Sequence, residues 1–189
     1  MERFAAHKRI LSLPVRYSLK EGSKSHYEQV WQDYMQHVRS VCEWASKSGG
    51  GTLVVDSETE QYALARLAHF GKLSQVPPNR YDVCYTDLRE IIRLVYETPK
   101  LNAVFIQKMG IRFNSNPPEW EVRGFSDIPY LVQANIRVSR DDIRDKDGHV
   151  THQFHARVLD CRQNIAVAGV DLTGPMCSIE MLLGFVHGQ

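Results

Sequence analysis

The sequence lacks the features that mark membrane and secreted proteins. No apolar run in its 189 residues approaches the ~20 residues that a membrane-spanning helix needs. The N-terminal segment has no continuous apolar core either, because Lys8, Arg9 and Arg16 interrupt it. We therefore expect a cytoplasmic protein with no membrane partner.

Cysteine is scarce and scattered. The four cysteines are Cys42, Cys84, Cys161 and Cys177. No two of them have the CxxC spacing of zinc sites, and their wide separation argues against a disulfide framework. We expect free thiols that pack as small apolar side chains.

The sequence also has no large excess of charge of either sign and no known catalytic motif. The net charge is only +1, whereas a dedicated nucleic-acid-binding protein usually carries a clear basic excess. The sequence contains no GxxxxGK[ST], GxGxxG, GxSxG or HExxH motif. The glycine-rich stretch SGGGTLVVD (48–56) follows a helical pattern and precedes a strand pattern, but a phosphate-binding loop needs the reverse order. We therefore expect no cofactor and no bound metal.

The first half of the chain is predicted to be mostly helical. Residues 1–22 are expected to form an extended arm, and residues 23–189 a single domain. Apolar side chains recur every three or four residues from Tyr27 to Ala45 and predict one long helix. The segment TLVVD (52–56) predicts a buried strand, and SETE (57–60) has the pattern of a capping box that opens a second helix. A third helix is predicted after Thr86.

The segment TPKLNAVFIQKMG (98–110) fits either a helix or a strand. Thr98 can cap a helix, Pro99 suits its first turn and Gly110 suits its end. The run AVFI favours a strand instead. We predict a helix over residues 99–109.

Strand patterns follow in the second half. Apolar and polar residues alternate in IPYLVQANIRVS (128–139) and HVTHQFHARVLDC (149–161), and IAVAGV (165–170) predicts a shorter third strand. Helices that precede antiparallel strands indicate an α+β fold. We expect N-terminal helices packed on a C-terminal antiparallel sheet with a long β-hairpin at about 129–161.

The stretch RDKDGHVTHQFHAR (144–157) resembles a metal site but is predicted to be a hairpin turn. In an extended strand, His149 and His155 would lie roughly 20 Å apart, with His152 on the opposite face, so the three histidines cannot share one ion. A type I turn closed by Gly148 aligns the apolar faces of the two strands. This register places His152 opposite Asp142 as a pair near the hairpin tip.

Two surfaces are candidates for contact with a partner. The polar face of the hairpin carries Arg137, His155 and Arg157, which suit an acidic partner surface or a nucleic acid. Trp44 lies off the apolar stripe of the long helix and is a candidate interface anchor. These residues, with the Asp142–His152 pair, are the predicted site residues.

The order of elements in 86–139 resembles part of a known structural family. A capped helix, the segment TPKLNAVFIQKMGI, the patch WEVRGF and the long strand IPYLVQANIRVS occur in that order. This order is similar to the later half of tail-terminator and neck-type proteins of tailed phages. The resemblance implies a structural ring subunit without a cofactor, located in the host cytoplasm and then in the virion.

The sequence leads to one expected function and two alternatives. We expect a non-enzymatic structural or assembly subunit, such as a phage tail or neck component, with protein partners or a homo-oligomeric state. The first alternative is a nucleic-acid-associated protein that uses the polar face of the hairpin. The second alternative is a small hydrolase whose site shows no recognisable motif.

Overall fold

The protein has the α+β fold that the sequence predicts. The structure, a computed structural model, describes residues 11–18, 22–112, 116–117 and 119–187, and the chain divides into two compact units, Met1–Ser126 and Asp127–Gln189. We call them unit 1 and unit 2 and describe each by itself, whereas the sequence predicts one domain from residue 23. Part of the predicted N-terminal arm lies outside the described residues. Its residues 11–18 have no regular secondary structure, and the Tyr17 hydroxyl donates to the Glu60 carbonyl oxygen at 2.8 Å within unit 1.

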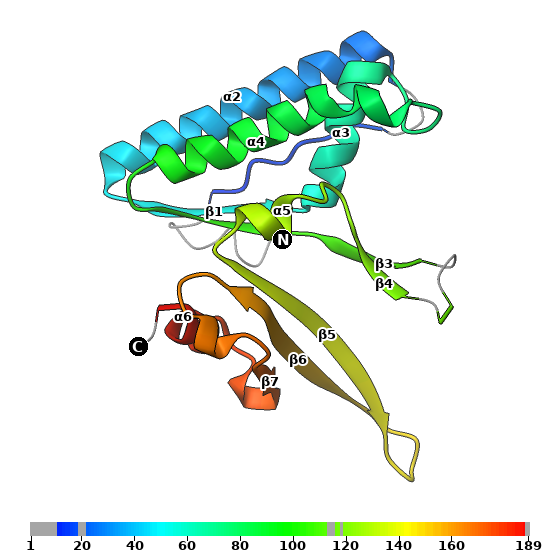
Figure 1. Cartoon of the computed structure of the whole chain (residues 1–189), viewed down its shortest axis with the longest axis vertical. Helices are drawn as coiled ribbons and strands as arrows, with labels where there is room; N and C mark the ends of the chain where they lie inside the picture. Colours follow the sequence, from blue (N-terminus) through cyan, green and yellow to red (C-terminus); the bar gives the residue numbers. More distant parts are fainter. Residues whose placement is uncertain (1–10, 19–21, 113–115, 118, 188–189) are drawn as a thin grey trace. The chain divides into compact units, whose positions relative to one another are not determined.

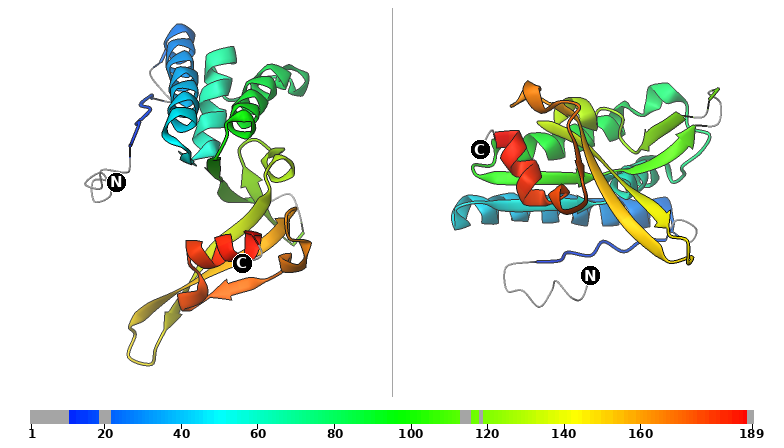
Figure 2. Two further views of the ribbon diagram at one scale, coloured as in Figure 1. Left: turned by 90° about the vertical axis from the view of Figure 1, so that its left-hand side faces the viewer. Right: turned by 90° about the horizontal axis from the view of Figure 1, so that it is seen from below.

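Unit 1 is built on three helices that lie side by side (Figures 1 and 2): α2 (Lys24–Ser48), α3 (Glu58–Phe70) and α4 (Asp82–Glu97). The predicted apolar stripe of α2 faces the core, where Tyr27 and Ala45 are 2% and 0% exposed. Helix α2 begins after Ser23, whose hydroxyl accepts from the backbone N–H of His26, and it ends at Gly49 in the left-handed region. Among the described residues, no helix is long and apolar enough to cross a membrane.

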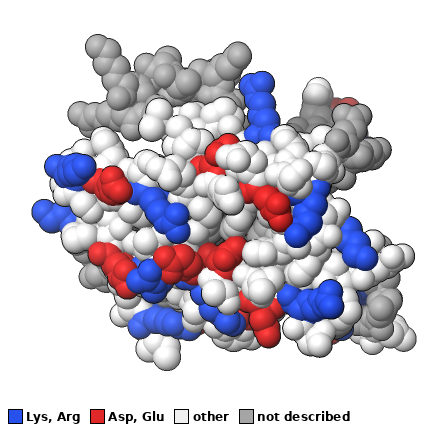
Figure 3. All heavy atoms as spheres, turned by 90° about the horizontal axis from the view of Figure 1, so that it is seen from above, with Lys and Arg blue, Asp and Glu red and all other residues white. Residues whose placement is uncertain are grey.

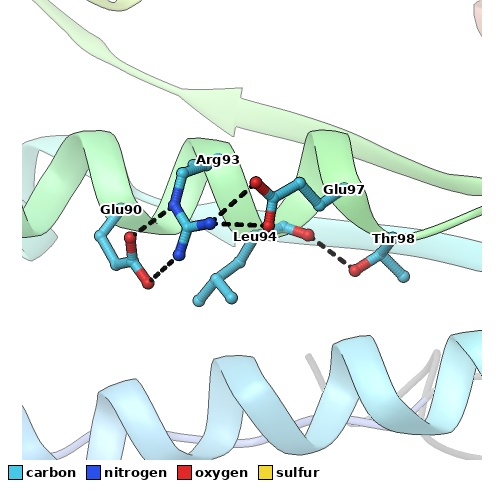
Figure 4. Close-up of polar contacts among 5 residues, drawn as sticks. All are labelled: Glu90, Arg93, Leu94, Glu97 and Thr98. Carbon is cyan, nitrogen blue, oxygen red and sulfur yellow. Dashed lines mark hydrogen bonds and ion pairs between the residues drawn. The ribbon is translucent and has the colours of Figure 1, made fainter.

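The outward side of the helices carries charge of both signs. Figure 3, which views the molecule from the side of α2 and α4, shows acidic and basic side chains interspersed. On α4, Arg93 bridges Glu90 and Glu97 (Figure 4). Its Nη2 atom lies 2.7 Å from a Glu90 carboxylate oxygen, and its Nη1 atom lies 2.7 Å from a Glu97 carboxylate oxygen. Such exposed ion pairs contribute little to stability, but the opposite charges within them neutralise each other.

Unit 1 also contains a two-stranded parallel sheet, β1 (Gly51–Asp56) and β2 (Leu101–Ile106), in register from Gly51 opposite Leu101 to Asp56 opposite Ile106. The helix predicted over 99–109 is therefore wrong. Thr98 ends α4 instead of starting a new helix, because its hydroxyl donates to the Leu94 carbonyl oxygen at 2.6 Å (Figure 4). Lys100 then takes a φ of +59°, which breaks any helical continuation.

A β-hairpin completes unit 1. It pairs β3 (Lys108–Arg112) with β4 (Glu119–Arg123) in antiparallel register. After β4 the chain returns to the core at Phe125, which is fully buried and stacks on Tyr85 with ring centroids 5.0 Å apart.

Unit 2 is a three-stranded antiparallel sheet in the order β5–β6–β7. Its elements are α5 (Ile128–Leu131), β5 (Ala134–Arg144), β6 (Val150–Cys161), η2 (Ile165–Val167), β7 (Asp171–Thr173), η3 (Gly174–Met176) and α6 (Ile179–His187). The predicted strand over 165–170 is wrong: Ile165–Val167 form the 3-10 helix η2, Gly169 takes a φ of +88° in the turn that follows, and β7 begins only afterwards. The predicted long hairpin is confirmed, although a short helix occupies its expected first residues.

The predicted hairpin register is confirmed. Val138 pairs with Ala156 and Ile136 with Val158. Gly148 closes the turn with a φ of +84° and donates its N–H to the Asp145 carbonyl oxygen at 3.2 Å. A bulge next to Ile136 leaves one residue of β6 unpaired. The bulge brings Val158 and Cys161 into the same small core, where both are fully buried.

Candidate functional site

The candidate site lies where the two parallel strands of unit 1 end. Asp56 is the last residue of β1, and Gln107 follows the last residue of β2 directly. Ligands of open α/β sheets bind beyond the carboxyl ends of parallel strands. Asp56 is exposed there, and its carboxylate has no hydrogen bond or ion pair with any residue that the structure describes.

Ser57, the next residue in the sequence, carries a second group that has no partner among the described residues. The sequence predicts that its hydroxyl caps α3, but the structure shows no such side-chain bond, and the backbone carbonyl of Ser57 accepts from Glu60 and Gln61 instead. Within the described part of the chain, the Ser57 hydroxyl oxygen is buried without a hydrogen-bond partner. Such an orphan group is rare in proteins and calls for a water, an ion or a ligand as its partner.

Glu58 connects the segments that surround the site. Its fully buried carboxylate accepts from the Gln107 side-chain amide at 2.7 Å and from the Phe125 backbone N–H at 3.1 Å. Burial raises the pKa of the Glu58 carboxyl, and these two hydrogen bonds lower it part of the way back. The contacts hold the end of β2 and the end of β4 against the start of α3, and we call Glu58, Gln107 and Phe125 the Glu58 cluster.

Thr59 strengthens the same junction. Its hydroxyl donates to the Arg123 carbonyl oxygen at 2.6 Å and accepts from the Lys108 backbone N–H at 2.9 Å. Consecutive residues of α3 thus fasten both ends of the β3–β4 hairpin. The position of Gln107 beside the carboxyl end of β1 is therefore set by tertiary contacts of α3.

A shallow cavity of about 370 Å³ lies between α3 and β4. Its polar lining includes Thr59, Arg66, Glu121 and Arg123. The guanidinium of Arg66 is held beside the Tyr62 and Tyr81 rings, 5.5 and 4.9 Å from their centroids, and it also bonds the Tyr81 hydroxyl at 3.0 Å. Charged side chains of both signs therefore line the cavity beside α3.

The structure brings the predicted pair at the hairpin tip together. The His152 Nδ1 atom lies 2.8 Å from an Asp142 carboxylate oxygen, and both side chains are 48% exposed. Hydrogen bonding to His152, together with the nearby Arg140, lowers the pKa of Asp142. The two side chains lie opposite each other on one face of the ladder, so their contact links β5 to β6.

The other predicted residues fall into two groups. Arg137, His155 and Arg157 share one face of the hairpin in unit 2, and His155 Nε2 lies 3.2 Å from an Asp141 carboxylate oxygen. Trp44 belongs to unit 1, where it is 59% exposed on α2. Its exposure agrees with the requirement for an interface anchor, and its role as one stays a prediction.

Three exposed residues of the turn, Asp145, Asp147 and His149, have ligand atoms within 4.8 Å of one another. The turn itself explains their proximity. One oxygen of Asp145 accepts from the backbone N–H groups of Asp147 and His149, at 2.9 Å each. This arrangement is the hydrogen bonding that an aspartate at the start of a tight turn normally makes.

Comparison of the chain with protein-family models, with curated proteins and with solved structures finds no match.

Sequence reasoning missed the residues at the carboxyl ends of the parallel strands: Asp56, Ser57, Glu58 and Gln107. A usable signal was present for the first two, because VVDSETE is an apolar strand that ends in aspartate and leads directly into a helix. Taken alone, however, this pattern predicts only a strand followed by a helix cap. No local signal marked Gln107, since its place depends on the pairing of β2 with β1.

Proposed function

We propose that unit 1 is part of a magnesium-dependent phosphohydrolase that acts on a nucleotide, which develops the hydrolase alternative. The observation that carries the proposal is the carboxylate of Asp56 at the carboxyl end of β1, which has no partner among the described residues. Two parallel strands joined through helices α3 and α4 support it, because this arrangement is the building unit of nucleotide-binding α/β proteins.

The residues present fit Mg²⁺ better than other metals. Mg²⁺ binds through one or two carboxylates, and substrate phosphates and waters complete its shell. Asp56 supplies one exposed carboxylate, and Ser57, the next residue in the sequence, has a buried hydroxyl with no partner among the described residues. A bound Mg²⁺ would neutralise phosphate charge during transfer. No cysteine or histidine neighbours Asp56 in the sequence, which disfavours a zinc site.

Gln107 and the Glu58 cluster have a positioning role in this proposal. The Gln107 amide donates to Glu58 and, at 3.0 Å, to the Phe125 carbonyl oxygen. Its side chain is therefore held at the end of β2, one residue after the position that pairs with Asp56. Both N–H groups of the amide are used in these two bonds, so its carbonyl oxygen is the group left to accept a hydrogen bond from a water.

Within the part of the chain that the structure describes, no glycine-rich loop lies between a strand and a helix where it could hold the phosphates. The proposal therefore assigns the phosphate contact to Mg²⁺ held by Asp56. The face of the parallel sheet that carries Asp56 is open. Val54, Val104 and Ile106 are 54%, 41% and 41% exposed on it, whereas parallel sheets are normally covered on both faces.

The test is magnesium-dependent nucleotide binding and phosphate release by the full chain, with ATP and GTP as substrates. We expect Asp56→Asn to lower both by at least about tenfold, because the metal loses its protein ligand. Asp33→Asn is the matched control, since Asp33 is an exposed aspartate on α2 that bonds only to Gln29. The proposal fails if the wild-type chain shows neither activity, or if Asp56→Asn equals the control.

The open sheet face also favours a second candidate function, which is the assembly subunit expected from the sequence. A ring subunit of a phage particle is one form of this function. Exposed apolar patches of this kind mark protein contacts. We expect the chain to associate in solution, and Val54→Ser with Val104→Ser to weaken the association. Light scattering coupled to size-exclusion chromatography measures the mass, with Val138→Ser as control, because Val138 is 63% exposed but lies in unit 2. A strict monomer at all concentrations would contradict this candidate.

A further inference from the structure

Arg66 on α3 is a partly buried cation without an acidic partner. Its guanidinium packs against the rings of Tyr62 and Tyr81, and its Nη2 atom donates to the Leu73 carbonyl oxygen and to the Tyr81 hydroxyl. All of these groups are neutral. Among the described residues, no carboxylate forms an ion pair with Arg66, whereas charges that proteins bury are normally paired.

The fold also leaves N–H groups of this guanidinium unused. The Nε atom of Arg66 is buried and has no hydrogen-bond partner in the part of the chain that the structure describes. Both hydrogen bonds of the guanidinium are made by Nη2, so no described residue accepts from Nη1 either. A buried donor without an acceptor costs stability. An anion that accepts from these groups would remove that cost.

Arg66 lines the shallow cavity of about 370 Å³ between α3 and β4. Small-molecule sites in proteins have volumes of this order and combine a mainly apolar wall with a few polar groups. The cavity has this composition, because its lining includes the apolar surfaces of Tyr62, Ala63, Leu73 and Val122. The cavity therefore suits a ligand that has an apolar body and one charged group.

The charges of the lining favour an anionic group. Two arginines and one glutamate line the cavity, which gives a net charge of +1. The glutamate, Glu121, already lies 3.5 Å from Arg123 and 4.0 Å from Arg112. Glu58 lies next to the lining residue Gly124 but is fully buried and is not itself part of the lining. The uncompensated charge of the cavity is thus that of Arg66.

We propose that this cavity binds a small organic oxyanion, a carboxylate or a phosphate ester with an apolar body, through the guanidinium of Arg66. Arginine suits both oxyanions, because its planar N–H groups match the spacing of their oxygens. The contacts with Tyr62, Tyr81 and Leu73 hold the guanidinium in place before a ligand binds, which lowers the entropic cost of binding. The proposal does not rest on the phosphohydrolase, since Asp56 is not part of the lining.

The experiment is an NMR titration of the isotope-labelled full chain in buffer freed of divalent cations, so that the magnesium site proposed at Asp56 does not contribute. Benzoate and phenyl phosphate are the oxyanions, and benzamide is the neutral analogue of benzoate. We expect an oxyanion to shift the Nε–H signal of Arg66 and the backbone signals of Ala63 and Gly124. We expect it to bind at least about tenfold more tightly than benzamide, which has no charge. The tighter of the two oxyanions identifies the ligand class.

Two variants test the cavity itself. Arg66→Gln is expected to weaken binding of the tighter oxyanion by at least about tenfold, because charged hydrogen bonds are lost. Ala63→Leu keeps the arginine but fills part of the cavity, and it is expected to weaken binding as well. Arg39→Gln is the matched control, since Arg39 is exposed on α2 and lies outside the lining. It is expected to bind as the wild type does.

The same spectra separate lost binding from lost folding, because a folded variant keeps the dispersed signals of the wild type. If Arg66→Gln does not fold, Ala63→Leu and the comparison with benzamide decide the question. Benzamide binding as tightly as the oxyanions would overturn the proposal. Binding by Ala63→Leu, or by a folded Arg66→Gln, that equals binding by the wild type would also overturn it. The same holds if neither oxyanion binds or if the shifts lie only outside the lining.

Discussion

Replacing Gly124 with alanine is expected to lower the free energy of unfolding of unit 1 by roughly 3–4 kcal/mol. Gly124 has a φ of +126°, and a Cβ atom added there would lie 2.3 Å from an oxygen of Glu58. The backbone would be strained, and the buried carboxylate would have to move away from Gln107 and Phe125. Both effects act on the junction that holds β2, β4 and α3 together.

Tryptophan fluorescence reports the unfolding of unit 1, where this loss of stability is expected. All three tryptophans, Trp31, Trp44 and Trp120, belong to unit 1. Gly49→Ala is the matched control, because Gly49 has a φ of +85° but no atom within 4 Å of an added Cβ. Its expected cost is about 1 kcal/mol, from backbone strain alone. Equal losses in the two variants would show that Glu58 does not need the space beside Gly124.

The hairpin of unit 2 could be predicted from the sequence because its determinants are local. Alternation along two adjacent segments sets which side chains face each other, and the residues DKDG select the turn. The pairing of Asp142 with His152 follows from these two facts alone. The long helix α2 was predictable for the same reason, since its apolar period lies within one continuous segment.

Contacts between distant segments explain the failures. The strand β2 pairs with β1, which lies about 50 residues earlier in the chain, and no local pattern records that pairing. Thr98 and Pro99 are compatible with the start of a helix, but Thr98 closes α4 instead, and parallel pairing then outweighs helix propensity. The run IAVAGV favours a strand, but residues 165–167 form the 3-10 helix η2, and Gly169 then takes a left-handed backbone conformation that turns the chain.

The candidate site could not be predicted from the sequence for a related reason. Glu58 contacts Gln107 and Phe125, which are 49 and 67 residues away in sequence. A glutamate in the first turn of a helix is ordinarily exposed and stabilised by the helix dipole. Only the tertiary structure shows that this one is buried, and its burial connects the stability of unit 1 to the position of Gln107.

Glu58→Ala is therefore expected to lower the free energy of unfolding of unit 1 by roughly 3 kcal/mol at neutral pH. The substitution leaves the buried Phe125 N–H without its acceptor, removes one of two acceptors from Gln107 and opens a cavity. Glu58→Gln keeps the shape and one carbonyl oxygen, so we expect a smaller loss. Glu43→Ala is a control, because Glu43 is an exposed glutamate on α2.

The difference in stability between the wild type and Glu58→Gln should also depend on pH. Burial raises the pKa of Glu58 above its ordinary value of 4.5, so the folded chain retains a proton that the unfolded chain releases. The contribution of this carboxyl to stability is then greatest below pH 4.5 and falls as the pH rises through the folded-state pKa. Denaturant unfolding from pH 4 to pH 8, followed by tryptophan fluorescence, should show the wild type losing stability relative to Glu58→Gln. A wild type that gains relative stability over this range would mean that the hydrogen bonds from Gln107 and Phe125 outweigh the burial of the charge.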